Sequence, residues 1–346
     1  MPGASSRGVH PPRGGEPLFR FGLVSDVQHA DIPDGQSFGG VPRYYRNALV
    51  LLRRAVEGFK ASDVAFALHL GDIVDFHNSV TPPEPGKALG REEEALQSVL
   101  DIFDELECPV YHMIGNHCLY CHRRPVLNRR LGIDRLQDAR PHSYYTVSPF
   151  PGWRLIVLDG YDVSALGWEP GHPLHEQAMA LLESRNPNEA RWCFGGDKNS
   201  PVGLEGLERR FVRFGGGVSD AQLAWLDGQL EAATAAGERV LVCCHLPLHP
   251  ATVPGVCLLW NYDEVLRRLQ AHPGTVLGTL CGHAHRDAYH RDEAGIHHRV
   301  CAAILETPPG SDCYGVVSVH EDAIEVAGHG AFESQVWDLT RAKRAP

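Results

Sequence analysis

The sequence predicts an α/β fold built mainly on parallel β-sheet. Short apolar runs that end abruptly in polar residues recur along the chain, as expected for buried strands. Stretches with helical periodicity lie between these runs, and strands that alternate with helices favour parallel sheet. The chain has 346 residues, 43% of them hydrophobic, so it is long enough to bury a substantial core.

Six apolar runs are expected to be strands, and four periodic stretches are expected to be helices. The strands are predicted at Phe19 to Ser25, Val64 to Leu70, Pro109 to Ile114, Trp153 to Leu158, Arg239 to Cys244 and Val276 to Cys281. The helices are predicted at about Arg46 to Lys60, Arg91 to Glu105, Asp220 to Ala235 and Asp263 to Gln270. After residue 300 the sequence is richer in strands, and a hairpin at 314–319 and 323–326 predicts that this end of the sheet is mixed.

The domain organisation follows from composition. Residues 1–17 are rich in Gly, Pro, Ser and Arg and lack the apolar stretch of a signal peptide, so we expect a disordered tail. Residues 18–346 are expected to form a single domain. Within it, residues 160–218 contain Pro-Gly and Gly-Gly pairs and are expected to be a loop-rich insertion, more often a lid or pocket wall than a second fold.

Charge and cysteine content limit the partners and the compartment. The formal net charge is −11, from 43 acidic and 32 basic residues, and no long basic run is present, so nucleic acid is not expected as a partner. No stretch approaches the roughly 20 apolar residues of a transmembrane helix, so no membrane partner is expected. The ten cysteines are expected to be mostly reduced thiols. We therefore expect a cytoplasmic protein, and a monomer.

Polar residues with metal-binding side chains follow five of the predicted strands. The strand ends lead into Ser-Asp-Val-Gln at 25–28, Gly-Asp-Ile-Val-Asp at 71–75, Gly-Asn-His at 115–117, His-Leu-Pro at 245–247 and Gly-His-Ala-His at 282–285. Sites in open α/β sheets form beyond the carboxyl ends of the strands, so these residues are expected to converge. If the segments are extended, Asp26 and Gln28 face one side together, as do His283 and His285.

The ordered set of five motifs resembles the calcineurin-like metallophosphoesterase superfamily, whose pattern is D-x-H, G-D-x-x-D, G-N-H-D/E, a lone His and G-H-x-H. The resemblance covers about residues 19–290 and implies a four-layer α/β/β/α sandwich with two mixed β-sheets. It implies two divalent metal ions, about 3.5–4 Å apart, that activate a bridging water. The ligands that it implies are Asp26, Gln28, Asp72 and His285 for one metal, and Asp72, Asn116, His245 and His283 for the other.

The resemblance also implies roles for two residues that do not bind metal. His117 would face the substrate and either protonate the leaving oxygen or stabilise charge on the phosphoryl group. Asp75 would orient a histidine or a bound water.

Two positions depart from the common pattern. Gln28 replaces the usual histidine, and because an amide oxygen suits Mn²⁺ better than Zn²⁺, we expect Mn²⁺ to be preferred, with Mg²⁺, Fe or Zn²⁺ as alternatives. Cys118 takes the place of the usual acid after the Asn-His pair, so the orienting role of that acid is absent or lies elsewhere.

Further segments are similar to one branch of the superfamily, the manganese-dependent ADP-ribose/CDP-alcohol diphosphatases. They are Arg-Phe-Val-Arg-Phe-Gly-Gly-Gly at 210–217, Cys-Leu-Leu-Trp-Asn-Tyr at 257–262 and Glu-Thr-Pro-Pro-Gly at 306–310. This likeness implies hydrolysis of a pyrophosphate bond, giving AMP and ribose 5-phosphate from ADP-ribose, or CMP and a phospho-alcohol from CDP-choline.

A nucleotide pocket needs an aromatic or apolar wall and polar groups for sugar and phosphate. The residues that we select for these roles are Phe38, Tyr44, Cys257 and Tyr262 for the wall, and Arg43, Lys198 and Asn199 for the far phosphate or sugar. Ordinary packing or solvent exposure is the simpler explanation for each. Three alternative functions remain at this stage: a phosphodiesterase of the same fold, a protein phosphatase of that fold, and a metal-free scaffold protein.

Overall fold

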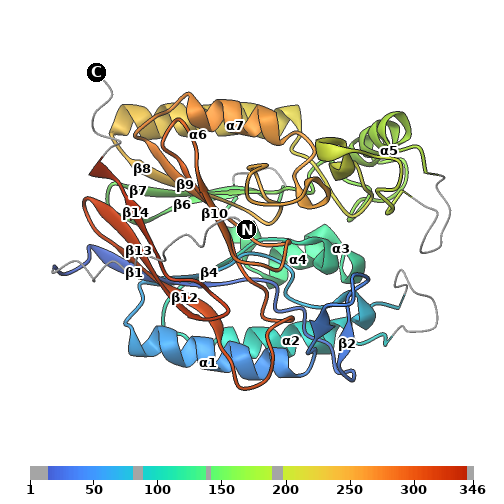
Figure 1. The fold of residues 1–346 in the computed structure, drawn as a ribbon, viewed down its shortest axis with the longest axis horizontal. Helices are drawn as coiled ribbons and strands as arrows, with labels where there is room; N and C mark the ends of the chain where they lie inside the picture. Colours follow the sequence, from blue (N-terminus) through green and yellow to red (C-terminus); the bar gives the residue numbers. More distant parts are fainter. Residues whose placement is uncertain (1–14, 81–88, 138–141, 189–197, 341–346) are drawn as a thin grey trace, which may run out of the picture.

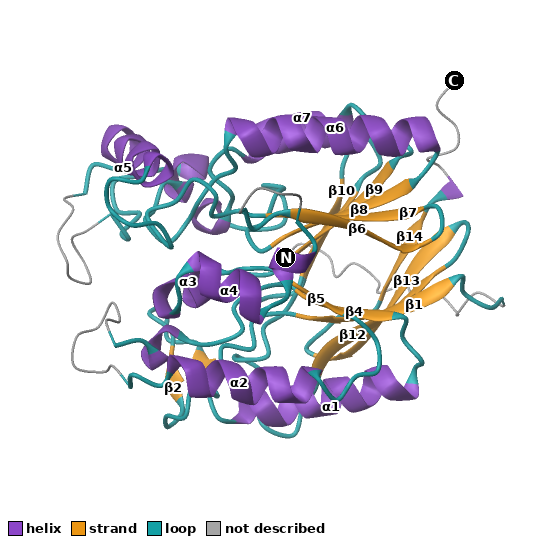
Figure 2. Cartoon of the chain, turned by 180° about the vertical axis from the view of Figure 1, so that it is seen from behind, coloured by secondary structure: helices purple, strands orange, loops and turns teal. Residues whose placement is uncertain are grey.

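Two six-stranded β-sheets lie face to face, and helices cover the outer side of each sheet (Figures 1 and 2). The structure is a computed structural model and describes residues 15–80, 89–137, 142–188 and 198–340. The expected tail at 1–17 therefore lies almost wholly outside the described residues. The four layers and the two mixed sheets confirm the predicted fold class.

The first sheet has the strand order β14-β13-β12-β1-β4-β5. Its strands are β1 (Phe19–Val24), β4 (Phe66–His69), β5 (Val110–His112), β12 (Cys313–Val319), β13 (Ala323–Gly330) and β14 (Gln335–Asp338). β1, β4 and β5 are parallel, whereas β12, β13 and β14 form antiparallel pairs. Helices α1 (Asn47–Ala61) and α2 (Glu92–Phe103) cover this sheet.

The second sheet has the strand order β10-β11-β9-β8-β7-β6. Its strands are β6 (Tyr145–Phe150), β7 (Trp153–Leu158), β8 (Arg239–Cys244), β9 (Val276–Cys281), β10 (Ala288–Arg291) and β11 (His297–Val300). Helices α6 (Asp220–Ala236) and α7 (Tyr262–Gln270) cover it. The Ser219 side chain caps α6 by accepting a hydrogen bond from the Gln222 N–H, and Gly237 ends the helix in the left-handed conformation.

The predicted strands and helices are all present, with bounds that differ by at most two residues from those expected, except that the second strand of the hairpin continues four residues further, to Gly330. Parallel pairing joins β1, β4 and β5 in one sheet and β7, β8, β9 and β11 in the other. The antiparallel β12 and β13 are the mixed end expected after residue 300, whereas the antiparallel pairing of β6 and β10 was not expected. Four strands of these two sheets have no prediction, and they are rich in polar or aromatic residues: β6, β10, β11 and β14. Apolar residues from both sheets and their covering helices form one continuous core.

The 160–218 segment contains more regular structure than expected. Helix α5 (Pro173–Arg185) lies in it, at the end of the sandwich where α3 (Asn116–Cys121), α4 (Arg124–Arg130) and the β2–β3 hairpin (Gly35–Gln36 and Pro42–Arg43) also lie. Only Ala178 and Leu182 of α5 are buried, so its apolar periodicity is too weak to see in the sequence. None of the described helices has the length and apolar character needed to cross a bilayer.

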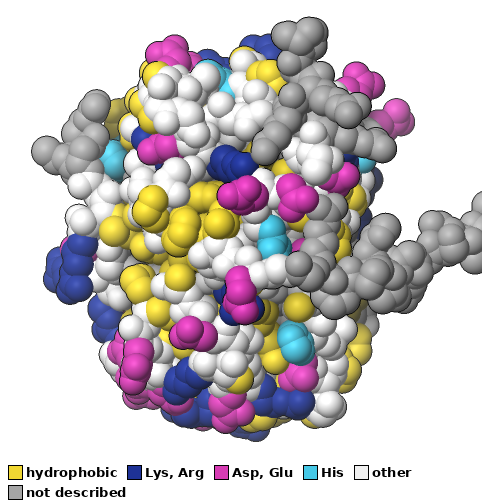
Figure 3. All heavy atoms as spheres, turned by 90° about the vertical axis from the view of Figure 1, so that its left-hand side faces the viewer, with side chains coloured by type: hydrophobic (Ala, Val, Ile, Leu, Met, Phe, Trp, Pro, Cys, Tyr) yellow, Lys and Arg dark blue, Asp and Glu magenta, His cyan; other side chains and the backbone are white. Residues whose placement is uncertain are grey.

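The opposite end of the sandwich carries charges of both signs. On the described part of this face, acidic and basic side chains are interspersed around a group of hydrophobic ones (Figure 3). The net negative charge of the chain is thus not gathered into one acidic surface here.

Two histidines are buried as a neutral pair in the first sheet. His69 Nδ1 and His112 Nδ1 lie 3.4 Å apart, and both rings pack against Phe103. Burial lowers the pKa of His69 to about 4, and it lowers the pKa of His112 well below its ordinary value. Protonation of either ring therefore opposes folding.

This pair predicts a loss of stability in acid. Between about pH 6.5 and pH 4 the unfolded chain binds more protons than the folded chain at His69, so the free energy of unfolding decreases as the pH falls. Urea unfolding with EDTA present should show that His69→Gln loses less stability than the wild type between pH 7.5 and pH 5, by about 2 kcal/mol. An identical loss in both proteins would contradict a buried neutral His69.

Candidate metal centre

The strand ends of both sheets are aligned, and this alignment brings the predicted ligands together. In the first sheet Val24 pairs with His69, and His69 pairs with His112. In the second sheet Cys244 pairs with both Leu158 and Cys281. The residues that follow these strands therefore lie side by side, beyond the aligned carboxyl ends of the strands of both sheets.

The backbone at this point is left-handed rather than extended. The described residues include six non-glycine residues with positive φ, and five of them are predicted ligands: Asp26 (51°), Gln28 (43°), Asp72 (55°), His283 (65°) and His285 (57°). The expectation of extended ligand segments was therefore wrong. Each such residue costs about 1–3 kcal/mol, which the surrounding structure must offset, and such residues cluster at functional sites.

Three glycines allow the ligand segments to touch. A Cβ atom at Gly71 would lie 2.5 Å from His245 Nδ1, one at Gly115 would lie 2.1 Å from Asp72 Oδ1, and one at Gly282 would lie 2.2 Å from Ser25 Oγ. Because real Cβ atoms do not approach other atoms this closely, no larger residue fits without displacing the site. Only Gly71 also has positive φ, at +97°.

Asp26, Asp72 and His245 form the buried centre of the site. Each offers one ligand atom, and these atoms all lie within 4.8 Å of one another. His245 Nε2 lies 3.3 Å from Asp72 Oδ2 and 3.9 Å from Asp26 Oδ1. The other His245 nitrogen, Nδ1, lies 2.7 Å from the Leu70 carbonyl oxygen, so the second sheet is tied to the first at this point.

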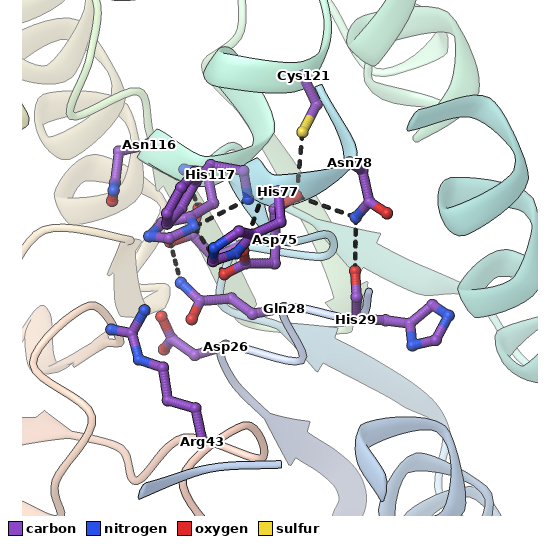
Figure 4. A network of polar contacts seen from close by, with 12 residues as sticks. Asp26, Gln28, His29, Arg43, Asp75, His77, Asn78, Asn116, His117 and Cys121 are labelled. Atoms are coloured by element: carbon purple, nitrogen blue, oxygen red, sulfur yellow. Dashed lines mark hydrogen bonds and ion pairs between the residues drawn. The ribbon is translucent and has the colours of Figure 1, made fainter. Parts of the chain in front are cut away.

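The other predicted ligands surround this centre. His285 Nε2 lies 3.3 Å from Asp26 Oδ1, and the Gln28 amide donates a hydrogen bond of 2.9 Å to Asp72 Oδ2. On the other side, His283 Nδ1 lies 3.0 Å from Asn116 Oδ1. Figure 4 shows Asp26 and Gln28 side by side, whereas the ring of His29 turns away from them.

Three buried atoms at the centre have no hydrogen-bond partner. They are Asp26 Oδ1, Gln28 Oε1 and His245 Nε2. Buried polar atoms are rarely unpaired, and these three belong to groups that bind divalent cations. The donor set, with four oxygen-bearing side chains and three imidazoles, therefore fits the two metal ions that the sequence implies.

The buried carboxylates and the neighbouring histidines shift one another's pKa values. Burial raises the pKa of Asp26, but His285 and His245 outweigh it and hold that pKa below its ordinary value. Burial likewise lowers the pKa of His285, but Asp26 and Glu306 outweigh it and raise the pKa to about 10. By contrast, burial and the neighbouring His245 lower the pKa of His283 to about 3. The ring of His283 is thus neutral and able to bind a cation.

His117 and Asp75 form a pair at the edge of this centre. His117 Nδ1 lies 3.1 Å from Asp75 Oδ2, and the His117 backbone N–H donates a hydrogen bond of 2.8 Å to Asp72 Oδ1. Burial raises the pKa of Asp75, but His117 and His77 outweigh it and hold the pKa well below its ordinary value. His77, for which the sequence indicated no role, places its Nδ1 2.5 Å from Asp75 Oδ1 (Figure 4).

The two cysteines of α3 support the segment that carries these acids. Cys118 Sγ accepts a hydrogen bond of 3.4 Å from the Ile73 N–H, and the Cys121 thiol donates one of 3.2 Å to the Asp75 carbonyl oxygen. Burial and the nearby Asp72 raise the pKa of Cys118 to about 12. The described cysteines are all free thiols, as expected.

Two residues that hold ligands in place were missed in the sequence. Glu306 Oε1 lies 2.8 Å from His285 Nδ1, and the Tyr161 hydroxyl donates a hydrogen bond of 3.0 Å to Asn116 Oδ1. Tyr161 follows the strand at 153–158 within the polar segment Asp-Gly-Tyr, so the rule applied to the other five strand ends would have found it. Glu306 lies in a segment that was noted only for its likeness to relatives.

The predicted substrate contacts fall into two groups. Arg43 lies at the centre, with its Nε 3.4 Å from Glu306 Oε1 (Figure 4). Cys257 lies close enough to Arg286 and Asp26 for both to influence its pKa, which burial raises to about 11. Tyr44 is held nearby, because its backbone N–H donates to the Leu305 carbonyl oxygen.

The remaining members of the set are placed differently. Phe38, at the tip of the β2–β3 hairpin, is 92% exposed, and the Tyr262 ring lies beneath the Arg210 guanidinium. Lys198 is buried within the insertion, where its Nζ donates to the Asn186 carbonyl oxygen and lies 3.2 Å from Glu183. Its ammonium group is thus engaged by the insertion itself, and Asn199 follows it there.

Comparison with known proteins places this site in a family. The family model for calcineurin-like phosphoesterases matches residues 19–287, which include every predicted metal ligand. The chain belongs to the calcineurin-like phosphoesterase family. A family member from Arabidopsis thaliana, named manganese-dependent ADP-ribose/CDP-alcohol diphosphatase, is 42% identical over 92% of this chain and 96% of its own length.

Other members of the calcineurin-like phosphoesterase family are also similar to this chain over nearly its whole length. A human protein with the same name as the Arabidopsis protein is 35% identical over 95% of both chains. The crystal structure of a dimetal phosphatase from Danio rerio superposes with a TM-score of 0.87 and 35% identity, covering 94% of this chain and all of the other. The likeness therefore includes the 160–218 insertion and the strands after residue 287.

The contact between Glu306 and His285 predicts the effect of a conservative substitution. Glu306→Gln removes the charge that orients His285, so the affinity for Mn²⁺ should fall about 10- to 100-fold. Isothermal titration of the metal-free protein measures this affinity. Glu321→Gln, at an exposed position before β13, is the matched control and should bind like the wild type. Equal affinities in all three proteins would show that Glu306 does not orient a ligand.

Proposed function

We propose that this protein is a dinuclear-metal hydrolase that cleaves the pyrophosphate bond of nucleoside diphosphate conjugates. The observation that carries the proposal is the convergence of seven donor side chains, three of them with unpaired buried atoms, at the aligned strand ends. The substrate class is supported by relatives named manganese-dependent ADP-ribose/CDP-alcohol diphosphatase, which match over nearly the whole chain. ADP-ribose would give AMP and ribose 5-phosphate, and CDP-choline would give CMP and phosphocholine.

We assign the metal ligands as the sequence implied. Asp26, Gln28, Asp72 and His285 would hold one ion, and Asp72, Asn116, His245 and His283 would hold the other. When bound, the two ions supply a water nucleophile and withdraw charge from the phosphoryl oxygens. The protein holds the donors in a fixed arrangement through the Leu70 carbonyl, Glu306 and the Tyr161 hydroxyl.

His117 is assigned to the leaving group. In the structure His117 Nδ1 accepts a hydrogen bond of 3.2 Å from the Phe76 N–H and lies 3.1 Å from Asp75 Oδ2. In its doubly protonated form the ring would instead donate Nδ1–H to Asp75, and Nε2–H would be available to protonate the departing phosphate oxygen. Asp75 stays ionised, because His117 and His77 lower its pKa. The carboxylate therefore orients the ring and stabilises its charge.

Arg43 and Cys257 are the substrate contacts that the geometry favours. The Arg43 guanidinium lies beside Glu306, next to a predicted metal ligand, and can bind the phosphate of the departing half of the substrate. Cys257 lies on the rim of the site, near Arg286. Phe38, Tyr44 and Tyr262 remain predicted wall residues, and the monomeric state and cytoplasmic location also remain predictions.

The reaction predicts specific products. With Mn²⁺, ADP-ribose should yield AMP, and CDP-choline should yield CMP, both detected by chromatography. His117→Ala should lower kcat by about 10²- to 10⁴-fold while the metal content is unchanged. His320→Ala, in the turn between β12 and β13, is the control and should keep full activity. Release of inorganic phosphate alone would exclude a diphosphatase and favour a phosphatase.

The metal preference can be tested through Gln28. After chelation, Mn²⁺ should restore activity at least about tenfold better than Zn²⁺, because amide and carboxylate oxygens suit Mn²⁺. The Gln28→His variant replaces an oxygen donor with an imidazole, so the ratio of the activity restored by Mn²⁺ to that restored by Zn²⁺ should be smaller than in the wild type. Activity restored by Zn²⁺ but not by Mn²⁺ in the wild type would contradict the predicted preference.

A further inference from the structure

A second group of metal-binding side chains lies outside the candidate metal centre. His249, Asp292 and His298 each offer a ligand atom, and these atoms all lie within 4.8 Å of one another. Asp292 and His298 are buried, and His249 is partly buried. None of the three belongs to the dinuclear site described above.

The β10–β11 hairpin positions two of these residues. Asp292 lies in its turn, and His298 on β11 is paired with His290 on β10, so the two histidines project from the same face of the hairpin. His249 comes from the segment that follows β8. Its ring stacks on those of His290 and His298, with centroids 4.5 Å away in both cases.

Hydrogen bonds from neighbouring residues fix the donors. The Ile296 N–H donates a bond of 2.8 Å to Asp292 Oδ1, and Gln270 Nε2 donates one of 2.9 Å to Asp292 Oδ2. His298 Nε2 lies 3.3 Å from Asp292 Oδ2, and its Nδ1 lies 2.9 Å from the Thr279 hydroxyl. A bound cation would select the tautomer in which Nδ1–H donates to the Thr279 hydroxyl, so that the Nε2 lone pair beside Asp292 is available to the ion.

We propose that His249, Asp292 and His298 bind a zinc ion. Two imidazole nitrogens and one carboxylate oxygen are a ligand set of the kind that zinc takes, with a water at the remaining position. The ligand atoms are His249 Nε2, His298 Nε2 and Asp292 Oδ2. In the structure the Ala251 N–H donates a hydrogen bond of 3.2 Å to His249 Nδ1, and zinc on Nε2 would require the ring proton to move to Nδ1 and this bond to open.

The electrostatic environment favours binding. His249 is partly buried, and Asp292 supplies the one negative charge among the three side chains. A bound zinc neutralises the charge of Asp292. It also joins the segment after β8, which begins at His245, to the hairpin that follows His285. Zinc here therefore steadies two segments that carry predicted ligands of the dinuclear site.

The proposal predicts a difference in metal stoichiometry. Wild-type protein equilibrated with Zn²⁺ and desalted should contain about one zinc ion per chain more than either His249→Gln or Asp292→Asn, measured by elemental analysis. His272→Gln is the matched control, because that histidine lies outside the group and contacts Thr234. Its zinc content should equal that of the wild type. The difference of one ion is expected whether or not the dinuclear site binds zinc. A failure of the zinc-site proposal can therefore be distinguished from a failure of the proposed hydrolase function.

Two further measurements complete the test. Zinc should raise the unfolding temperature of the wild type and of His272→Gln more than that of the two ligand variants. Equal zinc contents in all four proteins would overturn the proposal. A crystal of the zinc-loaded wild type provides a test that needs no substitution: anomalous density among the three side chains supports the site, and its absence overturns it.

Discussion

The structure depends on two carboxylates, Asp26 and Asp72, that are buried where the two sheets meet. Asp26 has no exposed surface and Asp72 is 1% exposed, so nearby positive charge must offset the loss of their hydration. Against the opposing effect of burial, Asp26 and Glu306 raise the pKa of His285 to about 10, so this ring supplies part of the charge, and Asp72 and Asp26 also raise the pKa of His245. Two divalent cations would supply far more. Cation binding and the stability of this end of the sandwich are therefore coupled.

This constraint accounts for the strained backbone around the site. The left-handed residues after β1, β4 and β9 are unfavourable one by one, yet they turn their side chains toward a shared centre. Glycine at 71, 115 and 282 leaves the space that those side chains need. The strain is held by hydrogen bonds across the sheets, including those from Asp26 N–H to the Gly71 carbonyl and from His245 to the Leu70 carbonyl. The same hydrogen bonds thus hold the strained backbone in place and direct the predicted ligand side chains toward one centre.

The supporting contacts come from parts of the chain that are distant in sequence. Glu306, from the segment after β11, fixes His285 and contacts Arg43, which the β2–β3 hairpin delivers. Tyr161, at the start of the insertion, fixes Asn116. The insertion is in turn anchored by the buried ion pair between Arg124 and Asp159. Arg43, a predicted substrate contact, is consequently linked to the predicted metal ligand His285 through Glu306.

The strand ends show how far a sequence can be interpreted. Buried central strands are continuous apolar runs, and the polar residues after them must face a shared edge, so both could be recognised without a structure. Edge strands such as β10 (Ala-Tyr-His-Arg) bury one face at most and carry no such pattern. Helix α5 was hidden for the same reason, because it buries only two residues. The periodicity of apolar residues reflects which side chains are buried, so elements that bury few side chains show little periodicity in the sequence.

By itself, the sequence determined the fold class and the central strands and helices, and it predicted the donors, because burial and metal chemistry restrict which residue types can occupy those positions. Only the tertiary structure decided the left-handed ligand backbone, the orienting contacts of Glu306, Tyr161 and His77, and the engagement of Lys198 within the insertion. It also brought His249 to the β10–β11 hairpin. These features depend on contacts between segments far apart in the chain, and local periodicity carries no information about such contacts.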